Sequence, residues 1–242
     1  MERLADGARA LGLRLTDKQL ASFQVYYEEL VAWNEKFNLT AITEYDQVQV
    51  RHFLDSLSCL LADEVRRALA RPDARAIDVG SGAGFPGIPL KLVCPGLHLT
   101  LLEATGKKVT FLEHMVERLG LQRVTPIHAR AEELAHDPAH REIYDLALAR
   151  AVADLPALVE YTLPFCRPGG WFVAQKGESG SAEAWSAGKA LEILGGELRR
   201  VLHVELSGLP EDRSLVVVAK VSPTPAAYPR RPGVPTKRPL GG

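Results

Sequence analysis

The sequence predicts an α/β fold: a seven-stranded sheet, mostly parallel, with covering helices and an N-terminal helical extension. From about residue 73 onward, short apolar runs alternate with segments of helical spacing, which is typical of a parallel sheet between helices. The last two strand-like runs, 197–206 and 213–221, are joined through Gly208 and Pro210. This connection is too short for a crossover helix, so the last pair must be antiparallel.

The first 72 residues are predicted to be helical. Residues 16–19 have the capping-box pattern of a helix start, and an apolar stripe follows that is expected to pack against the main domain. The stripe comprises Leu20, Phe23, Tyr27, Leu30 and Phe37. A junction at 71–73 then divides the chain into a helical segment packed on the core (1–72), a main domain (73–221) and a tail (222–242).

A further helix is expected after Asp46, with one face toward the core. Its other face carries Arg51, His52 and Asp55. The simplest interpretation of the four-residue spacing between Arg51 and Asp55 is an exposed ion pair on this helix.

In the main domain, strands and helices follow in a regular order. The predicted strands are 75–79, 99–102, 123–129, 144–149, 171–175, 197–206 and 213–221, and the predicted helices are 88–93, 106–119, 154–166 and 181–194. Pro126 cannot donate a hydrogen bond to a central ladder, so the third strand should lie at an edge of the sheet.

Close-set glycines follow the first strand, at 80, 82 and 84, two residues after Asp78. A strand that runs through glycines into a helix start holds a polar ligand against backbone N–H groups. A dinucleotide fingerprint would need glycine at the position of Phe85, which disfavours a nicotinamide dehydrogenase. The turn suits a smaller polar group, such as the methionine moiety of S-adenosylmethionine, and Phe85 is expected to line that pocket rather than sit in the core.

A carboxylate at the end of the second strand strengthens the prediction of a cofactor site. Glu103 follows the run 99–102, at about the separation at which nucleotide-binding βαβ units present the acid that binds the ribose. The alternative is that Glu103 caps a helix and the glycines form a plain tight turn. The cofactor site is favoured because strand, glycines, helix, second strand and acid occur in order.

Composition narrows the class of protein. The chain has 242 residues, 46% hydrophobic and 24% charged, which is ordinary for a globular protein with a full core. No apolar run is long enough to span a membrane, and no leader pattern follows Met1. Three scattered cysteines without metal spacing favour a reduced, cytoplasmic setting and predict no metal site: Cys59, Cys94 and Cys166.

The tail differs from the rest of the chain in charge. It holds four basic side chains and no acidic ones, whereas the remainder has 25 basic against 30 acidic groups. Its prolines predict an extended segment without a core of its own. Two interpretations remain open, a contact to a nucleic-acid backbone and a solvated basic end.

Several longer stretches are more specific than the glycine loop. They are Asn38-Leu39-Thr40, Arg51-His52-Phe53-Leu54-Asp55-Ser56, Phe85-Pro86-Gly87-Ile88-Pro89-Leu90, Leu101-Leu102-Glu103, Ala131-Glu132, Arg150-Ala151, Lys176-Gly177, Arg213-Ser214-Leu215-Val216-Val217 and Tyr228-Pro229-Arg230-Arg231-Pro232-Gly233. The strand order resembles that of the class I, Rossmann-like, S-adenosylmethionine-dependent methyltransferases. Over nearly the whole length, the chain resembles the bacterial small-subunit (16S) ribosomal RNA guanine-N7 methyltransferases, the glucose-inhibited division protein B family.

The resemblance implies a cofactor, a substrate and a set of site residues. The cofactor is S-adenosyl-L-methionine, and the partner is small-subunit ribosomal RNA or the small ribosomal subunit, bound by a cytoplasmic monomer. The implied cofactor contacts are Gly80, Gly82, Phe85, Glu103, Ala104, Thr105, Ala131, Glu132 and Arg150, and the implied substrate contacts are His52, Lys176 and Arg213. Relatives often have Asp-Ser in place of Glu103-Ala104, and a His where this chain has Ser214.

The motifs present and absent in the sequence also indicate which substrate atom is methylated. Methylation of an exocyclic amine typically uses an Asn/Asp-Pro-Pro-aromatic loop after the fourth strand, where this chain has residues 150–153. Methylation at a pyrimidine C5 needs a nucleophilic cysteine, and none of the three lies in a recognisable loop. Guanine N7 has a lone pair and no proton to lose, so its methylation is mainly a task of alignment, with no general base expected.

Two basic residues at predicted strand ends are candidates for the substrate side. Arg150 and Lys176 could hold guanine O6 or a phosphate, although Arg150 could equally bind the cofactor or form a structural ion pair. Two other functions stay open: a methyltransferase for another RNA, a protein or a small molecule, and a cofactor-sensing or RNA-binding protein without catalysis.

Overall fold

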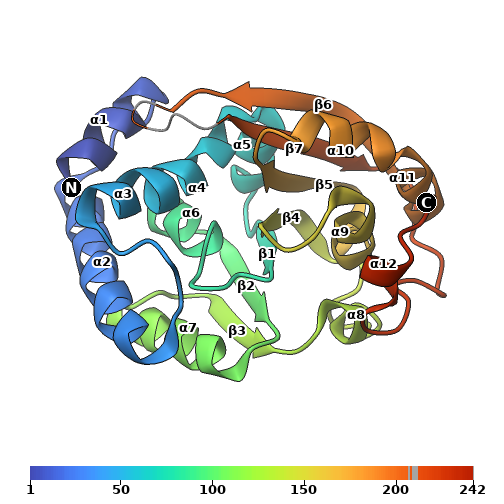
Figure 1. The fold of residues 1–242 in the computed structure, drawn as a ribbon, viewed down its shortest axis with the longest axis horizontal. Helices are drawn as coiled ribbons and strands as arrows, with labels where there is room; N and C mark the ends of the chain where they lie inside the picture. The colour runs from blue at the N-terminus through green and yellow to red at the C-terminus, as the bar shows by residue number, and fades with distance from the viewer. Residues whose placement is uncertain (207, 209–211, 242) are drawn as a thin grey trace.

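A computed structural model describes residues 1–206, 208 and 212–241 (Figure 1). Its strands are β1 (Arg75–Val79), β2 (His98–Glu103), β3 (Val124–His128), β4 (Tyr144–Arg150), β5 (Cys166–Lys176), β6 (Gly196–Val204) and β7 (Arg213–Lys220). They form one seven-stranded sheet in the order β3-β2-β1-β4-β5-β7-β6. β7 runs antiparallel to β5 and to β6, and the other neighbours are parallel. The predicted α/β fold is confirmed, and Pro126 lies in an edge strand as expected.

Helices cover both faces of the sheet. Those before the end of β3 are α1 (Glu2–Ala10), α2 (Asp17–Phe37), α3 (Tyr45–Val48), α4 (Asp55–Leu57), α5 (Asp63–Leu69), α6 (Gly87–Val93) and α7 (Gly106–Arg118). The later ones are α8 (Ala131–Leu134), α9 (Leu155–Thr162), α10 (Gly180–Ser186), α11 (Gly188–Leu194) and α12 (Val234–Lys237). In Figure 1, α2, α6 and α7 lie on the left of the sheet, and α9, α11 and α12 on the right. None of the described helices is long and apolar enough to cross a membrane.

The predicted bounds of two helices and one strand are wrong. The helix predicted to reach residue 166 ends at 162, and β5 starts at Cys166, which pairs with Tyr144. The helix predicted over 181–194 is two helices that break next to Gly188, a weak helix former. The β6–β7 connection includes Pro210, which lies outside the described residues.

The N-terminal helices share one buried core with the sheet. The capping box at Thr16 is present, and Phe23 and Leu30 of α2 are buried as predicted. Tyr26, which the predicted stripe missed, is fully buried, and its hydroxyl donates to the Ala83 carbonyl at 2.5 Å. α2 therefore packs directly on the glycine loop.

The segment after Asp46 differs from the predicted regular helix. It comprises α3, a π-helical stretch (Gln49–Leu54), α4 and a 3₁₀ turn (Ser58–Leu61). Asp55 is only 4% exposed and pairs with arginines of the sheet, so the predicted exposed Arg51–Asp55 pair is wrong.

The prediction of an extended tail is also wrong. The tail forms the short helix α12 and lies against α8 and α9. Arg230 pairs with Glu160, a fully buried carboxylate that the sequence does not reveal as its partner.

Candidate cofactor and substrate site

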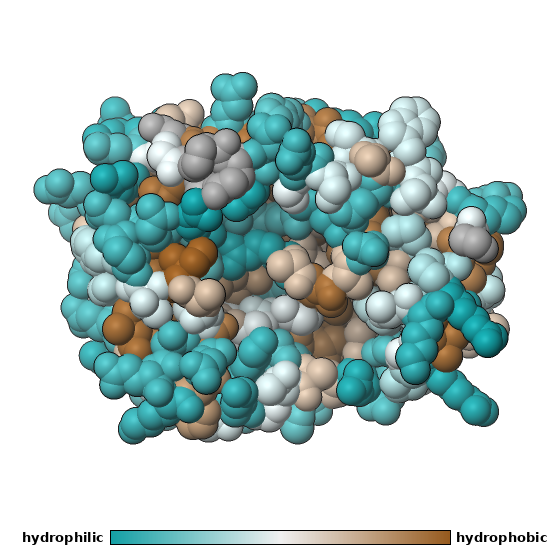
Figure 2. Space-filling model, in the orientation of Figure 1, coloured by the Kyte–Doolittle hydropathy of each residue, from teal (hydrophilic) through white to brown (hydrophobic). Residues whose placement is uncertain are grey.

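The predicted site residues gather at the carboxyl ends of the parallel strands. The glycine loop follows β1, Glu103 ends β2, Arg150 ends β4 and Lys176 ends β5. An open α/β sheet binds ligands at this edge. Figure 2 shows this face hollowed near its centre, with hydrophilic side chains along the upper wall.

The glycine loop has a backbone that other residues fit poorly. Gly80 and Gly84 have φ angles of 71° and 96°, in the left-handed region. A Cβ at Gly80 would lie 2.7 Å from the Val152 side chain, and one at Gly84 would lie 2.6 Å from the Tyr26 hydroxyl. A side chain at either position would therefore collide with its neighbours, which explains the glycines of this turn.

Asp78 lies under this loop with an incomplete set of partners. Its side chain is fully buried, and Oδ2 accepts from the Gly87 N–H at 2.8 Å. Oδ1 has no hydrogen-bond partner among the described residues. Burial raises the pKa of Asp78 to about 7. A buried carboxylate oxygen without a partner next to a glycine cradle fits a ligand with a cationic amino group, as the methionine moiety of S-adenosylmethionine has.

Glu103 is tied to backbone on two sides. Oε2 accepts from the Gly82 N–H at 2.9 Å, and Oε1 accepts from the Thr105 N–H at 2.8 Å, next to the start of α7. The side chain is 6% exposed, and each carboxylate oxygen can accept a second bond. Glu103 thus holds the backbone of the glycine loop and of the segment before α7, whose N-cap is Thr105 with no side-chain cap hydrogen bond, so the interpretation of Glu103 as a helix cap is wrong. Ala104 and Thr105 follow it at the surface.

The segment after β3 lies beside Glu103. The Ala129 N–H donates to the Glu103 carbonyl at 3.2 Å, and α8 begins at Ala131. Glu132 is buried, and its Oε1 accepts from the N–H of Gly233 in the tail at 3.0 Å. No sequence pattern signals this contact, because it joins residues 101 positions apart.

Phe85 does not line an open pocket, which corrects the prediction. It is 5% exposed and belongs to the core, where its ring stacks on those of Tyr26 and His52 at 5.3 and 4.6 Å between centroids. The guanidinium carbon of Arg150 lies 5.0 Å from the centre of the ring. Phe85 therefore packs against both His52 and Arg150, and its contact to Arg150 is a cation–π contact.

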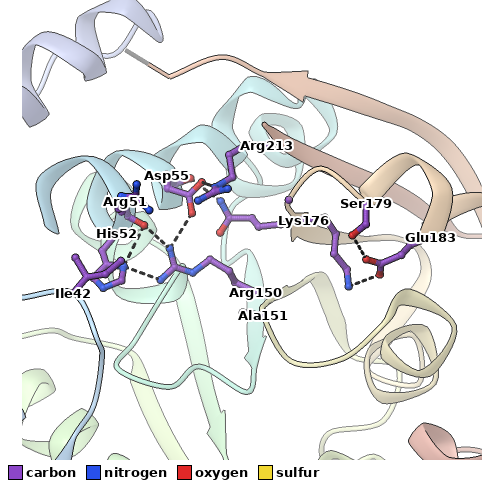
Figure 3. Close-up of a pocket in the computed structure, with 12 residues that line it drawn as sticks. Ile42, Arg51, His52, Asp55, Arg150, Ala151, Lys176, Ser179, Glu183 and Arg213 are labelled. Atoms are coloured by element: carbon purple, nitrogen blue, oxygen red, sulfur yellow. Dashed lines mark hydrogen bonds and ion pairs between the residues drawn. The ribbon is translucent and has the colours of Figure 1, made fainter. Parts of the chain in front are cut away.

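A cleft of about 390 Å³ brings the predicted substrate residues together (Figure 3). Its lining includes His52, Arg150, Lys176 and Arg213. Figure 3 shows Arg150 pointing toward His52 and Asp55, whereas Lys176 points away from them toward Glu183. The cleft therefore has two charged groups of residues.

The first group is centred on Asp55. Arg150 donates from one nitrogen to Oδ2 of Asp55 at 2.9 Å and to the Arg51 carbonyl at 3.1 Å. Arg213 approaches Oδ1 of Asp55 at 3.7 Å. Burial and the nearby Arg150 charge lower the pKa of His52 to about 3, so this imidazole is neutral at physiological pH. Its Nε2 lies 2.8 Å from the Thr40 hydroxyl.

The second group is centred on Lys176. Its Nζ lies 2.6 Å from Oε2 of Glu183 and donates to the Ala153 carbonyl, also at 2.6 Å. The Lys176 side chain is only 9% exposed. These contacts tie the strand end to the loop after β4 and to α10, so Lys176 also has a structural role.

Gln175 lines the cleft and was not predicted. Its Nε2 donates to the Asp55 carbonyl at 2.6 Å, while Oε1 is buried with no partner in the described part of the chain. A glutamine at a strand end carries no signal of such a role in the sequence.

The described residues offer no group of three or more His, Cys, Asp or Glu side chains that could hold a metal ion. Within this part of the chain, the polar groups of the candidate site are backbone N–H groups, carboxylates and basic side chains.

Comparison with known proteins identifies the family. The model of the family described as "GidB: rRNA small subunit methyltransferase G" matches residues 19–216. The chain belongs to this family. A relative from Roseiflexus castenholzii, named ribosomal RNA small subunit methyltransferase G, is 50% identical over 99% of this chain and 100% of its own. Relatives of the same name from Dehalococcoides mccartyi and Alkaliphilus metalliredigens are 48% and 46% identical, over at least 97% of both chains.

Two solved structures share the fold. TrmN from Thermus thermophilus superimposes with a TM-score of 0.52 at 20% identity, over 72% of this chain and 53% of that one. Geranyl diphosphate C-methyltransferase from Streptomyces coelicolor gives 0.53 at 12% identity, over 81% and 98%. These similarities concern the fold alone, which is that of the class I S-adenosylmethionine-dependent methyltransferases.

Proposed function

We propose that this protein transfers the methyl group of S-adenosylmethionine to N7 of a guanine in small-subunit ribosomal RNA. Membership of the rRNA small subunit methyltransferase G family supports the substrate class. The observation that carries the proposal is the position of the arginine-rich cleft, which adjoins the glycine loop at the same edge of the sheet. A cofactor in the one would face a nucleotide in the other.

The cofactor side is formed by three consecutive strand ends. The methionine moiety of S-adenosylmethionine would lie over the glycine loop, with its amino group on Asp78. The ribose would bind Glu103. The base would then reach the start of α8, at Ala131 and Glu132. The cofactor supplies a methyl group that is already electrophilic because it is bound to a sulfonium.

The substrate side supplies positive charge around a neutral imidazole. Arg150 is engaged by Asp55, by the Arg51 carbonyl and by the Phe85 ring, which suits a positioning residue for the cleft. Arg213, with 24% of its side chain exposed, is the better placed to reach a phosphate or the O6 edge of guanine. His52, stacked on Phe85, presents an uncharged ring that a cationic 7-methylguanine does not repel.

Methyl transfer to N7 requires little from the side chains beyond aligning guanine with the methyl group of the cofactor. N7 attacks with an in-plane lone pair and loses no proton, so no side chain has to act as a base in the transfer step. A His52 whose pKa is held near 3 is a weak base, which agrees with this. We expect the protein to act as a monomer in the cytoplasm, where ribosomal subunits assemble.

Labelled cofactor tests the proposal. The protein is incubated with unmodified 16S rRNA and with small subunits, and cleavage at 7-methylguanosine is mapped. Label in a single guanine is the expected result. Label in protein or small-molecule fractions would instead favour another methyltransferase, and bound cofactor with no S-adenosylhomocysteine product would favour a non-catalytic protein.

A further inference from the structure

We propose that the C-terminal segment 228–238 is a positioning element of the cofactor site. It holds α8 and the side chain of Glu132 in place beside the adenine end of S-adenosylmethionine. The inference rests on the cofactor placement proposed above. It assigns the tail to a contact within the protein in place of the RNA-backbone contact that its charge suggested.

The segment is fixed by a buried ion pair. Glu160 of α9 has no exposed surface. Its Oε1 accepts from the backbone N–H of Arg230 at 2.7 Å and from Nε at 2.9 Å, and its Oε2 lies 2.7 Å from a terminal nitrogen of the same guanidinium. A fully buried carboxylate is strongly unfavourable without such a partner. Arg230 therefore anchors the tail on α9.

From this anchor, backbone groups of the tail reach α8. The Gly233 N–H donates to Oε1 of Glu132 at 3.0 Å. The Pro229 carbonyl lies 2.8 Å from Nε2 of His136, just after α8. Both contacts lie within a few residues of Arg230, so they depend on where the anchor holds the chain.

Arg141 ties the same two parts together. Its guanidinium donates to the Ala135 carbonyl, at the end of α8, and to the Tyr228 carbonyl in the tail, each at 2.9 Å. The Tyr161 hydroxyl of α9 adds a 2.7 Å hydrogen bond to Thr236 in α12. The tail thus bridges α8 and α9 at several points.

α8 needs this support because it is weak by itself. It has four residues, too few for a helix to be stable without tertiary contacts. It also follows β3, which has a neighbouring strand on one side only. Among the described residues, the tail packs on the outer side of this unit, and it therefore determines the orientation of α8.

The orientation of α8 matters for the cofactor. α8 begins beside Glu103, because the Ala129 N–H donates to the Glu103 carbonyl. A ligand whose ribose is bound at the end of β2 places its base over β3, the next strand in the sheet, and so against the first turn of α8. The Gly233 bond fixes one oxygen of Glu132, and the other can accept from the amino group of adenine.

The experiment compares two neighbouring arginines in the full chain. Arg230→Ala removes the anchor, and Arg231→Ala removes the same charge from an exposed position. Titration calorimetry with S-adenosylmethionine, well below the unfolding temperature, should give a Kd about tenfold higher for Arg230→Ala and within twofold of the parent for Arg231→Ala. Hydrogen exchange over residues 131–136, without cofactor, should be faster in the first variant only.

Arg230→Lys gives a milder change if Arg230→Ala does not fold. It keeps a cation for Glu160 but loses the fork of N–H donors, and the cofactor Kd should rise about threefold. The KM for rRNA should stay unchanged in every tail variant that folds. An rRNA KM that rises while the cofactor Kd stays unchanged, or an equal loss of cofactor affinity in Arg231→Ala, would overturn the proposal.

Glu103→Gln distinguishes a failure of the proposed tail role from a failure of the proposed cofactor placement. Weaker cofactor binding in this variant together with normal binding in the Arg230 variants would refute the role of the tail alone. Normal binding in Glu103→Gln would refute the cofactor placement on which that role rests.

Discussion

The two halves of the proposed site, a cofactor half and a substrate half, are built in different ways. The cofactor half, over β1 to β3, consists mainly of backbone N–H groups and carboxylates that hold them, such as Asp78 on Gly87 and Glu103 on Gly82. The substrate half, over β4, β5 and β7, is built from side chains that neutralise one another around Asp55. Substitutions in the cofactor half should therefore change ligand affinity. Substitutions in the substrate half should lower stability, because they leave a buried charge unpaired.

The largest effect is expected at Asp55. Asp55→Ala removes the carboxylate that Arg150 contacts at 2.9 Å, and the loss of one partner from a buried pair costs roughly 3–5 kcal/mol of stability. Urea unfolding measures it, and methyl transfer should be lost as the cleft rearranges. Asp63→Ala breaks an exposed ion pair with Arg66 and should leave unfolding unchanged. Equal effects in the two variants would mean that Asp55 is not the centre of the substrate half.

Phe85 lies between the two halves, and its replacement tests whether it is a core residue or part of the cofactor pocket. Because the ring is buried against Tyr26 and His52, Phe85→Ala should lower the free energy of unfolding by about 3 kcal/mol. The measurement is denaturant unfolding without cofactor. Unchanged stability with weakened cofactor binding would return Phe85 to the pocket lining that the sequence suggested.

A smaller loss is expected at Glu103. Glu103→Gln replaces charge-assisted hydrogen bonds by weaker ones, so S-adenosylmethionine should bind about 1–3 kcal/mol less tightly. Titration calorimetry measures this, with Glu113→Gln on the exposed face of α7 as the matched control. An affinity equal to that of the control would remove Glu103 from the site.

Acid should weaken cofactor binding through Asp78. Burial raises the pKa of this group to about 7, so it is protonated below that pH and ionised above it. A cationic amino group binds the ionised form, and the affinity should therefore fall about tenfold as the pH drops from 7 to 5.5. The Kd of Asp78→Asn should not change over this range. A wild-type Kd that also stays flat would mean that Asp78 does not meet the amino group.

The smallest effect concerns the transfer step itself. With both ligands saturating, the single-turnover rate should stay within about twofold from pH 6 to pH 9, because no catalytic base titrates. Rapid quench with labelled cofactor gives this rate. A rate that climbs with pH and then levels off, or a His52 variant that binds both ligands yet is inactive, would move the target from N7 to a protonated amine or hydroxyl.

The sequence by itself determined the α/β fold and the local stretch that joins the glycine loop to Glu103. Alternating strands and helices, Pro126 and the short last connection predicted a mostly parallel sheet with β3 at an edge and an antiparallel last pair, and the glycines with Glu103 lie within a continuous stretch of the chain. Backbone geometry of this kind is local, so nearby residues reveal it.

Only the tertiary structure decided the rest. Asp55 meets Arg150 across 95 positions of the chain, and Arg230 meets Glu160 across 70. Spacing along the chain suggested a local partner for Asp55, and the charge of the tail suggested either a nucleic-acid backbone or open solvent for Arg230. A buried charge takes whichever opposite charge the fold brings within reach, because water no longer solvates it, and sequence separation has no bearing on that choice.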